Sequence, residues 1–407
     1  MNPAAQDHGR LGDLPSAEDS GWMALSETEV AFQTKLEVLR DLESKVLELM
    51  EVHEQKRPLW YPSEVLGPAP GADPERHLEE LKKRAAGIPD SARAALALNL
   101  LTEEGLPHFH RLLAVYLGDD SHWRRWNNLW TAEEDRHGTV LNYYVRDTGL
   151  VNQRRLEEMQ FSYIKSGFQP EWDKDPYRVF AYTTLQERAT QQSHSETGRI
   201  IGNYEPLLAE VLTNVATEEA RHFSFYRTIF EEILKRDPDQ ALLSASHILP
   251  SIEMPGHTMP GFREIADVIR RSGIYGPRDY LRIVQEQIRY WKIETLNGLN
   301  ELGRKAQERI MGIPERLQRI AAQVLGLLHL AHVGALRPAT EELPSRPGAA
   351  ERGAVDGRPH HAPAWRRRAR NRRTTNERGR TLAIASFTAP IGCRESRVRA
   401  RFSASPR

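Results

Sequence analysis

The chain has a single cysteine among its 407 residues, Cys393. This excludes an intramolecular disulfide framework and metal sites built from several thiolates. No apolar run approaches the roughly 18–20 residues of a membrane-spanning helix. Residues 1–22 also lack the apolar segment of a secretory signal peptide. We therefore expect a soluble protein without a membrane span, located in the cytoplasm.

Lysine is absent from residues 343–407, although this segment has sixteen arginines and only four acidic residues. Its net charge is +12, and because the whole chain is neutral, the rest of the chain carries −12. A net-acidic body disfavours nucleic acid as a partner, since phosphate binding needs clustered positive charge. For residues 341–407 we expect a disordered tail, and a non-native reading frame would explain its composition. A basic arm for nucleic acid or anionic lipid is the alternative.

Convincing strand patterns are absent, and a helical period dominates after the polar residues 1–25, which we expect to be disordered. The pattern predicts an all-α body of about ten helices separated by proline and glycine. Their expected positions are about 28–54, 74–86, 90–117, 120–147, 152–167, 176–204, 205–236, 260–273, 277–298 and 302–333. The helical domain should span residues 26–340.

One pentapeptide pattern, E-E-x-R-H, occurs twice in the chain, 85 residues apart. Each copy has a Glu and a His three residues apart: Glu134 with His137, and Glu219 with His222. On a helix both side chains of a pair leave the same face, which is otherwise mostly apolar here. An unpaired carboxylate buried there would be costly, so a metal site is favoured over a surface Glu–His pair. Two helices carrying these pairs can bind two metal ions between them.

Two further helices would each have to add a carboxylate to complete the di-iron site of a four-helix bundle. Glu103 is one candidate, and the helix beside it either kinks at Pro107 or ends near Gly105. Glu187 is the other, although it could equally pair with a surface Arg and His194 is a competing ligand. Four carboxylates and two neutral imidazoles carry charge −4, which two divalent ions neutralise. Such donors suit iron or manganese better than copper.

Four stretches of the chain resemble the soluble acyl-acyl-carrier-protein (acyl-ACP) desaturases, the family of the plant stearoyl-ACP enzyme and its actinobacterial relatives. They are Thr102–Pro107 (TEEGLP), Trp130–Gly138 (WTAEEDRHG), Leu185–Thr190 (LQERAT) and Glu218–His222 (EEARH). The resemblance, which runs from about Trp60 to about Asn300, implies a ferritin-like bundle with two Fe2+ per subunit. It implies the metal ligands Glu103, Glu134, His137, Glu187, Glu219 and His222.

The family pattern also implies a role for each of these residues. It makes Glu134 and Glu219 the bridging ligands and leaves His194 unligated. Glu103 and Glu187 would be terminal ligands. Adjacency to the motifs, and not the family pattern, makes Trp130, Arg136, Thr190, Glu218 and Arg221 candidates for orienting the ligands, with an ordinary packing role as the alternative for Trp130.

The resemblance implies an O2-dependent enzyme that introduces a cis double bond into an acyl chain carried on acyl carrier protein, in unsaturated fatty acid biosynthesis. Ferredoxin or a similar protein would supply electrons, and a homodimer is expected. Carrier protein is acidic, so Arg76, Lys82, Lys83 and Arg84 are a candidate contact, with a solvated helix face as the alternative. The alternative function is a ferritin-like di-iron protein with another role, namely an N-oxygenase, an iron store or a non-catalytic paralogue.

A ribonucleotide reductase small subunit would share the ligand pattern. It would need a radical-forming Tyr near the metal. Leu141 stands four residues after His137, so that class is disfavoured.

Overall fold

The computed structural model describes residues 27–116, 121–168, 175–252 and 254–333, and every structural statement below concerns these residues. Within them the regular elements are helices and there is no strand, which confirms the expected all-α class. None of the described helices combines the length and apolar character needed to cross a bilayer. The expected disordered ends, residues 1–25 and 341–407, lie outside the described residues. The predicted domain boundaries therefore stay predictions.

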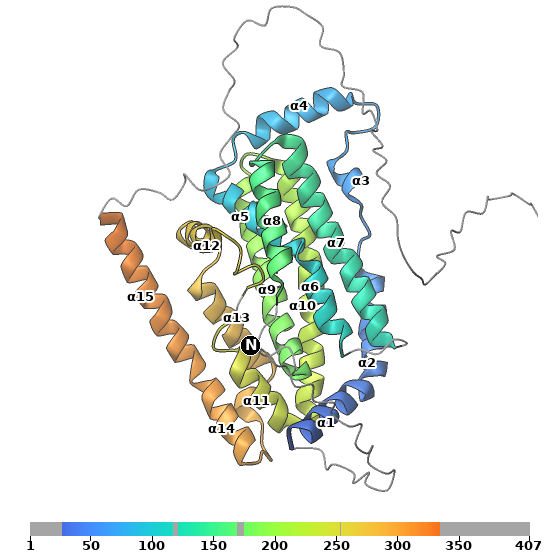
Figure 1. The fold of residues 1–407 in the computed structure, drawn as a ribbon, viewed down its shortest axis with the longest axis vertical. Helices are drawn as coiled ribbons and strands as arrows, with labels where there is room; N and C mark the ends of the chain where they lie inside the picture. The colour runs from blue at the N-terminus through green and yellow to red at the C-terminus, as the bar shows by residue number, and fades with distance from the viewer. Residues whose placement is uncertain (1–26, 117–120, 169–174, 253, 334–407) are drawn as a thin grey trace, which may run out of the picture. The chain divides into compact units, whose positions relative to one another are not determined.

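The described residues form the following helices, given in chain order (Figure 1). They are α1 (Glu27–Asp41), α2 (Glu43–Lys56), α3 (Pro62–Leu66), α4 (Pro74–Ala85), α5 (Asp90–Glu103), α6 (Leu106–Ala114), α7 (His122–Thr148), α8 (Gln153–Ser166), α9 (Pro176–Ile201), α10 (Pro206–Arg236), α11 (Pro238–Ile248), α12 (Phe262–Arg271), α13 (Pro277–Tyr290), the 3-10 helix η1 (Ile293–Thr295), α14 (Glu301–Met311) and α15 (Ile313–Val333).

Several of the expected helices are divided in the structure. The helix expected at 90–117 ends at Glu103, and a second helix starts after Gly105 with Pro107 in its first turn. Proline suits that position because the first N–H groups of a helix have no partner within the helix. Of the two alternatives left open, a helix end is therefore the correct one. The helix expected at 277–298 stops at Tyr290, close to Lys292 with its positive φ of 53°.

Two helices, α3 and α11, were not predicted. Pro238 reads as a helix breaker in the sequence, but in the structure it is the first residue of α11. Asp237 precedes it and its side chain accepts a hydrogen bond from the main-chain N–H of Gln240 at 3.4 Å. Proline and a capping aspartate thus start a helix at a point where the pattern indicated only an end.

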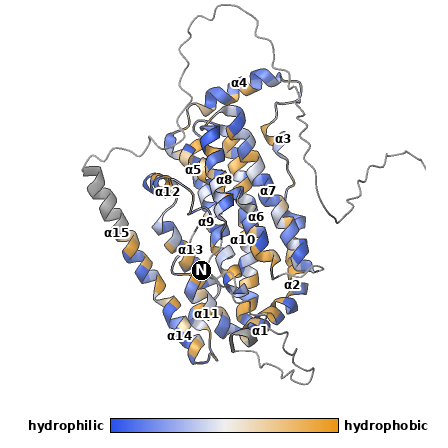
Figure 2. Cartoon of the chain, in the orientation of Figure 1, coloured by the Kyte–Doolittle hydropathy of each residue, from blue (hydrophilic) through white to orange (hydrophobic). Residues whose placement is uncertain are grey.

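A core of four helices, α5, α7, α9 and α10, positions the candidate site. α9 packs along α10, and α5 packs against both α7 and α9; Figure 1 shows α7, α9 and α10 running side by side. Hydrophobic and hydrophilic residues alternate along these helices (Figure 2), as expected for helices that bury one face. The bundle therefore brings the buried faces of the two E-E-x-R-H helices toward each other.

The apolar core consists of two clusters, and both continue along the same helices. On α7, Trp126 and Trp130 belong to one cluster and Leu141 to the other. On α10, Val215 belongs to the second cluster and Tyr226 to the first. The E-E-x-R-H motifs lie between these positions in the sequence of each helix. A polar layer therefore interrupts the core at the level of the motifs.

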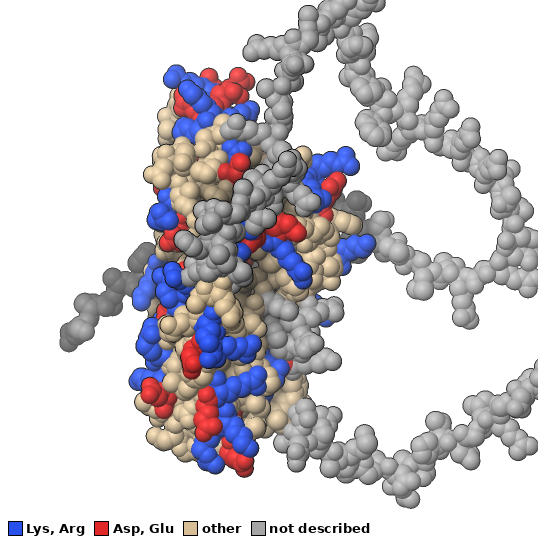
Figure 3. Space-filling view, turned by 90° about the vertical axis from the view of Figure 1, so that its left-hand side faces the viewer, with Lys and Arg blue, Asp and Glu red and all other residues tan. Residues whose placement is uncertain are grey.

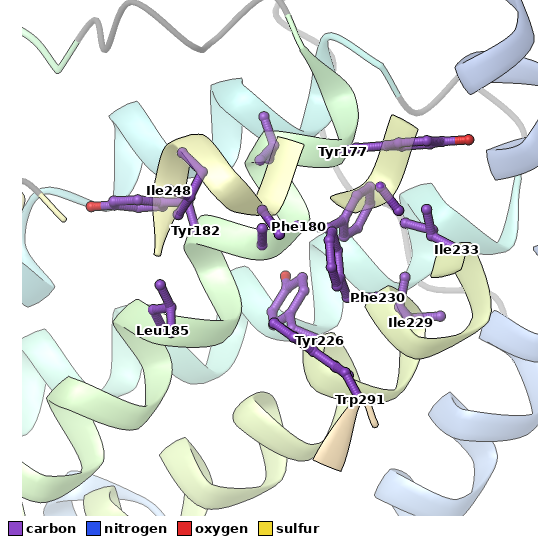
Figure 4. Packing of buried hydrophobic residues seen from close by; sticks show 14 of the residues in the cluster. Tyr177, Phe180, Tyr182, Leu185, Tyr226, Ile229, Phe230, Ile233, Ile248 and Trp291 are labelled. Carbon is purple, nitrogen blue, oxygen red and sulfur yellow. The ribbon is translucent and has the colours of Figure 1, made fainter. Parts of the chain in front are cut away.

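Figure 4 shows the first cluster at close range, where α9 and α10 meet. Leu185 and Tyr182 come from α9, while Tyr226 and Phe230 come from α10. Leu185 and Tyr226 are fully buried and stand close in sequence to Glu187 and His222. The polar layer is thus bordered by packed apolar and aromatic side chains.

Candidate metal centre

The structure brings all six predicted ligands together inside the bundle. Glu103 is the last residue of α5, Glu134 and His137 are on α7, Glu187 is on α9, and Glu219 and His222 are on α10. Their exposed fractions are at most 6%, and four of the six are 0% exposed. Six titratable side chains in so dry a place need either mutual neutralisation or a bound cation.

The ligand atoms form two groups that share two carboxylates. One group is Glu103, Glu134, His137 and Glu219; the other is Glu134, Glu187, Glu219 and His222. Within each group one atom per residue lies within 4.8 Å of all the others. The shared residues, Glu134 and Glu219, occupy the same position in the two motifs. Two neighbouring cations would each find one imidazole, one carboxylate of their own and two shared carboxylates.

Many polar atoms at this place have no hydrogen-bond partner among the described residues. They include both carboxylate oxygens of Glu187 and Glu219, and Nδ1 of His137 and His222. His222 Nδ1 lies 2.9 Å from Glu134 Oε1 and His137 Nδ1 lies 3.3 Å from Glu219 Oε1, without hydrogen-bond geometry. A buried unsatisfied polar atom costs about 1–3 kcal/mol. Carboxylate oxygens with imidazole nitrogens are donors that suit a divalent metal, so the residues fit a metal site.

The pKa values also reflect a concentration of negative charge. Burial and repulsion from Glu219 and Glu103 raise the pKa of Glu134 to about 8. Burial and the same Glu219 raise the pKa of Glu187 well above its ordinary value. Burial would also raise the pKa of Glu219, but His137 and His222 hold it well below the usual range. Without a cation the site therefore holds protons that a bound metal would displace.

Each motif's first glutamate binds the histidine of the other motif. His222 Nε2 is 2.8 Å from Glu133 Oε2, and His137 Nε2 is 2.9 Å from Glu218 Oε2. Glu133 and Glu218 are both 1% exposed. An ionised carboxylate can only accept, so Nε2 of each imidazole carries a proton, and Nδ1 is the ring nitrogen left for a metal to bind. The two motifs thus fix each other's histidines with Nδ1 available to a metal.

The predicted orienting residues fall into two sets. Glu218 contacts His137, and Arg136 and Arg221 lie 2.6 Å and 3.2 Å from Glu218. Trp130 and Thr190 are buried, but the Thr190 hydroxyl bonds within its own helix, to the carbonyl of Gln186. Trp130 Nε1 has no partner among the described residues. For Trp130 and Thr190 a role at the site therefore stays a prediction.

His194, the competing ligand, lies outside both groups of ligand atoms. Its ring is fully buried, and Nε2 is 2.7 Å from Glu103 Oε1. Asn99 Nδ2 lies 3.3 Å from the other ring nitrogen. In the structure His194 therefore holds Glu103 in place.

Three residues at the site were not predicted: Glu133, His53 and Trp60. Glu133 occupies the same motif position as Glu218, so comparison of the two copies would have found it. His53 Nε2 is 2.9 Å from Glu133, and Trp60 Nε1 donates to Glu218 at 3.1 Å. Both come from the segment before α3, where no motif marks them.

A cavity of about 680 Å³ reaches the edge of the site. Glu103 and Glu104 form part of its wall, together with Gly138 and Asn142. Asn142 donates a hydrogen bond to Glu104, and burial raises the pKa of Glu104. The cavity leaves small molecules an approach to one ligand of the site.

The fatty acid desaturase family model matches residues 34–327 of the chain. Stearoyl-[acyl-carrier-protein] 9-desaturase 1, chloroplastic, of Oryza sativa subsp. indica is 35% identical over 307 residues, covering 70% of this chain and 80% of the relative. Palmitoyl-[acyl-carrier-protein] 4-desaturase 3, chloroplastic, of Ophrys sphegodes is 34% identical over 312 residues, covering 72% and 78%.

A solved structure, that of DesA2 from Mycobacterium tuberculosis H37Rv, is more distant. It is 18% identical, with a TM-score of 0.49, over 66% of this chain and 98% of that chain. This likeness is too low to support a statement about the present chain. The family match, in contrast, covers well over half of the sequence and includes all six predicted ligands. The chain belongs to the fatty acid desaturase family, and acyl-ACP desaturases are its relatives.

Proposed function

We propose that this protein is an acyl-ACP desaturase. It would remove one hydrogen from each of two adjacent CH2 groups of an acyl chain on acyl carrier protein, leaving a cis double bond. These two hydrogens, with two electrons from a donor and two protons from solvent, would reduce O2 to two waters. The observation that carries the proposal is the pair of buried ligand groups sharing Glu134 and Glu219, in a chain whose relatives are acyl-ACP desaturases. Those relatives favour this function over iron storage or N-oxygenation.

Two Fe2+ are the cofactor that fits this set of residues. Glu103 and His137 would hold one ion and Glu187 and His222 the other, with Glu134 and Glu219 shared. The four carboxylates carry −4 when ionised, which two divalent ions balance. When bound, the iron pair supplies the activation of O2 and the oxidising power for the reaction. Hard oxygen donors with imidazole agree with iron.

The chain's own contribution is burial and orientation. Glu133 and Glu218 hold the imidazoles with Nδ1 free, so the ligands need little rearrangement when metal binds. The packed side chains on either side of the polar layer keep water away from the reacting groups. An alkyl chain has no polar group near the reacting carbons, so an apolar tunnel must select the bond by position. Trp130 and Thr190 stay candidates for orienting the ligands.

The proposed partners are acyl carrier protein, ferredoxin or a similar donor, and a second copy of the chain in a homodimer, with all of them in the cytoplasm. The candidate contact on α4 is weakened by local pairing. Arg76 lies 3.1 Å from Glu80, and Lys82 lies 3.1 Å from Glu79. Figure 3 shows Lys and Arg among Asp and Glu over one face of the molecule. A solvated helix face therefore describes α4 better than a basic patch for carrier protein.

The test is incubation of the iron-loaded protein with acyl-ACPs of several chain lengths, reduced ferredoxin and O2. Mass analysis of the released acyl chains should show the loss of two hydrogens from at least one of them. The Glu219→Ala variant, which removes a shared carboxylate, should show none. If no acyl chain loses hydrogen although two irons are bound, the desaturase function is wrong.

A further inference from the structure

The imidazoles of His137 and His222 are held by unequal sets of neighbours. The consequence drawn here rests on the proposed di-iron function. We propose that His53 is a positioning residue for one metal only, acting through Glu133 on His222. The other metal, beside His137, does not depend on such a residue because Glu218 contacts two arginines and Trp60.

Glu133 has hydrogen bonds to three described side chains, those of His53, Arg57 and His222. Of these, His53 is the one that contacts both carboxylate oxygens. His53 Nε2 is 2.9 Å from Oε2 and 3.1 Å from Oε1 of Glu133. Arg57 donates to Oε1 at 2.9 Å, and its side chain is 22% exposed. The same Oε2 receives Nε2–H of His222 at 2.8 Å. Since the carboxylate only accepts, His53 must be the Nε2–H tautomer and acts as a donor.

The His53 ring also packs against His222. Their ring centroids are 5.9 Å apart with an interplanar angle of 15°. Trp126 lies edge-on to both rings, with its centroid 5.2 Å from that of His53 and 6.4 Å from that of His222. His53 thus restrains His222 both by contact and through the shared carboxylate.

Glu218 is held by a larger and more strongly charged set. Arg136 donates to Oε1 at 2.6 Å, Arg221 lies 3.2 Å from the same oxygen, and Trp60 Nε1 donates to it at 3.1 Å. His137 has Oε2 to itself. Loss of Trp60 here leaves two permanent cations, Arg136 and Arg221, in place. Loss of His53 leaves Glu133 with an ion pair to one arginine, Arg57, while the charge of Arg221 acts on both glutamates.

A third metal site at His53, Glu133 and His222 is the competing interpretation, because their ligand atoms also lie close together. Two observations disfavour it. Both imidazoles use Nε2, which carries a proton in their hydrogen bonds to Glu133. Arg57 already places a positive charge 2.9 Å from Glu133, which would repel a metal ion. The cluster therefore serves to hold His222.

The test compares 57Fe(II) binding by the unsubstituted protein with binding by His53→Leu, His53→Gln and Trp60→Phe under anaerobic conditions. The readouts are iron retained during dialysis against a weak chelator and the Mössbauer spectrum. His53→Leu should bind one of its two irons about 10–100-fold more weakly, the usual effect of removing a residue that orients a ligand. His53→Gln keeps an amide donor at similar reach and should retain both irons. Trp60→Phe, the matched loss of one donor at Glu218, should also retain both.

The outcomes separate this proposal from the proposed function. If the unsubstituted protein does not bind two irons, the di-iron function itself is wrong. If it binds two but His53→Leu binds both unchanged, or loses both equally, the positioning role is wrong. Loss of one iron from Trp60→Phe would also overturn the proposed inequality. If circular dichroism shows that His53→Leu does not fold, His53→Asn, whose amide is too short to reach Glu133, replaces it with the same expected outcomes.

Discussion

Removal of metal should destabilise this protein more at pH 8 than at pH 6. In the metal-free folded state the pKa of Glu134 is about 8, raised by burial and by Glu219 and Glu103. In the unfolded chain it has its ordinary value of 4.5. Between these values the folded state binds more protons than the unfolded one, so the stability of the metal-free form falls as the pH rises. Glu187, His137 and His222 also have raised pKa values and act in the same direction.

The size of the effect follows from the shift of Glu134 alone. Each pH unit in this window costs about 1.4 kcal/mol, so the rise from pH 6 to pH 8 costs roughly 3 kcal/mol. The unfolding entropy of a body of roughly 300 residues is about 0.6 kcal/mol per kelvin. The melting temperature of the metal-free form should therefore fall by about 5 °C relative to the metal-loaded form over these two pH units.

The assay is a thermal melt of iron-loaded and chelator-treated protein at pH 6, 7 and 8, with the difference in melting temperature as the readout. Burial lowers the pKa of His53, which makes stability fall below pH 6.5. That contribution is present in both forms and cancels in the difference. The reasoning would be refuted if the two forms had the same melting temperature, or if the difference between their melting temperatures became smaller as the pH rises.

Three further predictions concern the framework. Gly105→Ala should cost about 1–3 kcal/mol in urea unfolding, because its Cβ would overlap the hydroxyl and ring of buried Tyr163, and an unchanged midpoint would contradict this. Lys35→Met should weaken the docking of α1, detected by hydrogen exchange, because Lys35 Nζ contacts Asp175, the capping residue of α9, at 2.9 Å; unchanged exchange would contradict this. Glu205→Ala should cost about 1 kcal/mol or more in urea unfolding, because Glu205 caps α10 while fully buried, and an unchanged midpoint would contradict it.

The candidate ligands were predictable because their signal is local. Glu134 and His137 stand on one helix face at a fixed spacing, and a second copy repeats the pattern. The apolar residues around them also indicate burial, which the structure confirms. Glu103 and Glu187 lacked such a repeat, and the family resemblance selected them. Their metal-binding role stays a prediction, although the structure places them in the two groups.

What could not be predicted depends on contacts between distant parts of the chain. His53 is 80 residues from Glu133, and Trp60 is 158 residues from Glu218. Neither stands in a motif, so only the folded bundle reveals that they contact the site. The start of α11 at Pro238 was missed for another reason. Proline ends a helix when it follows the helix and starts one when it occupies the first turn, and the periodicity alone did not distinguish the two.

The most direct test of the central claim is the metal content of the purified protein and of Glu134→Ala, measured by mass spectrometry of the metals after iron loading. Glu134 belongs to both groups of ligand atoms, so its loss affects both metals. The account predicts about two irons per chain in the unsubstituted protein and a large loss of both in the variant, which should still be folded. Fewer than two irons in the unsubstituted protein, or two irons retained by folded Glu134→Ala, would contradict it.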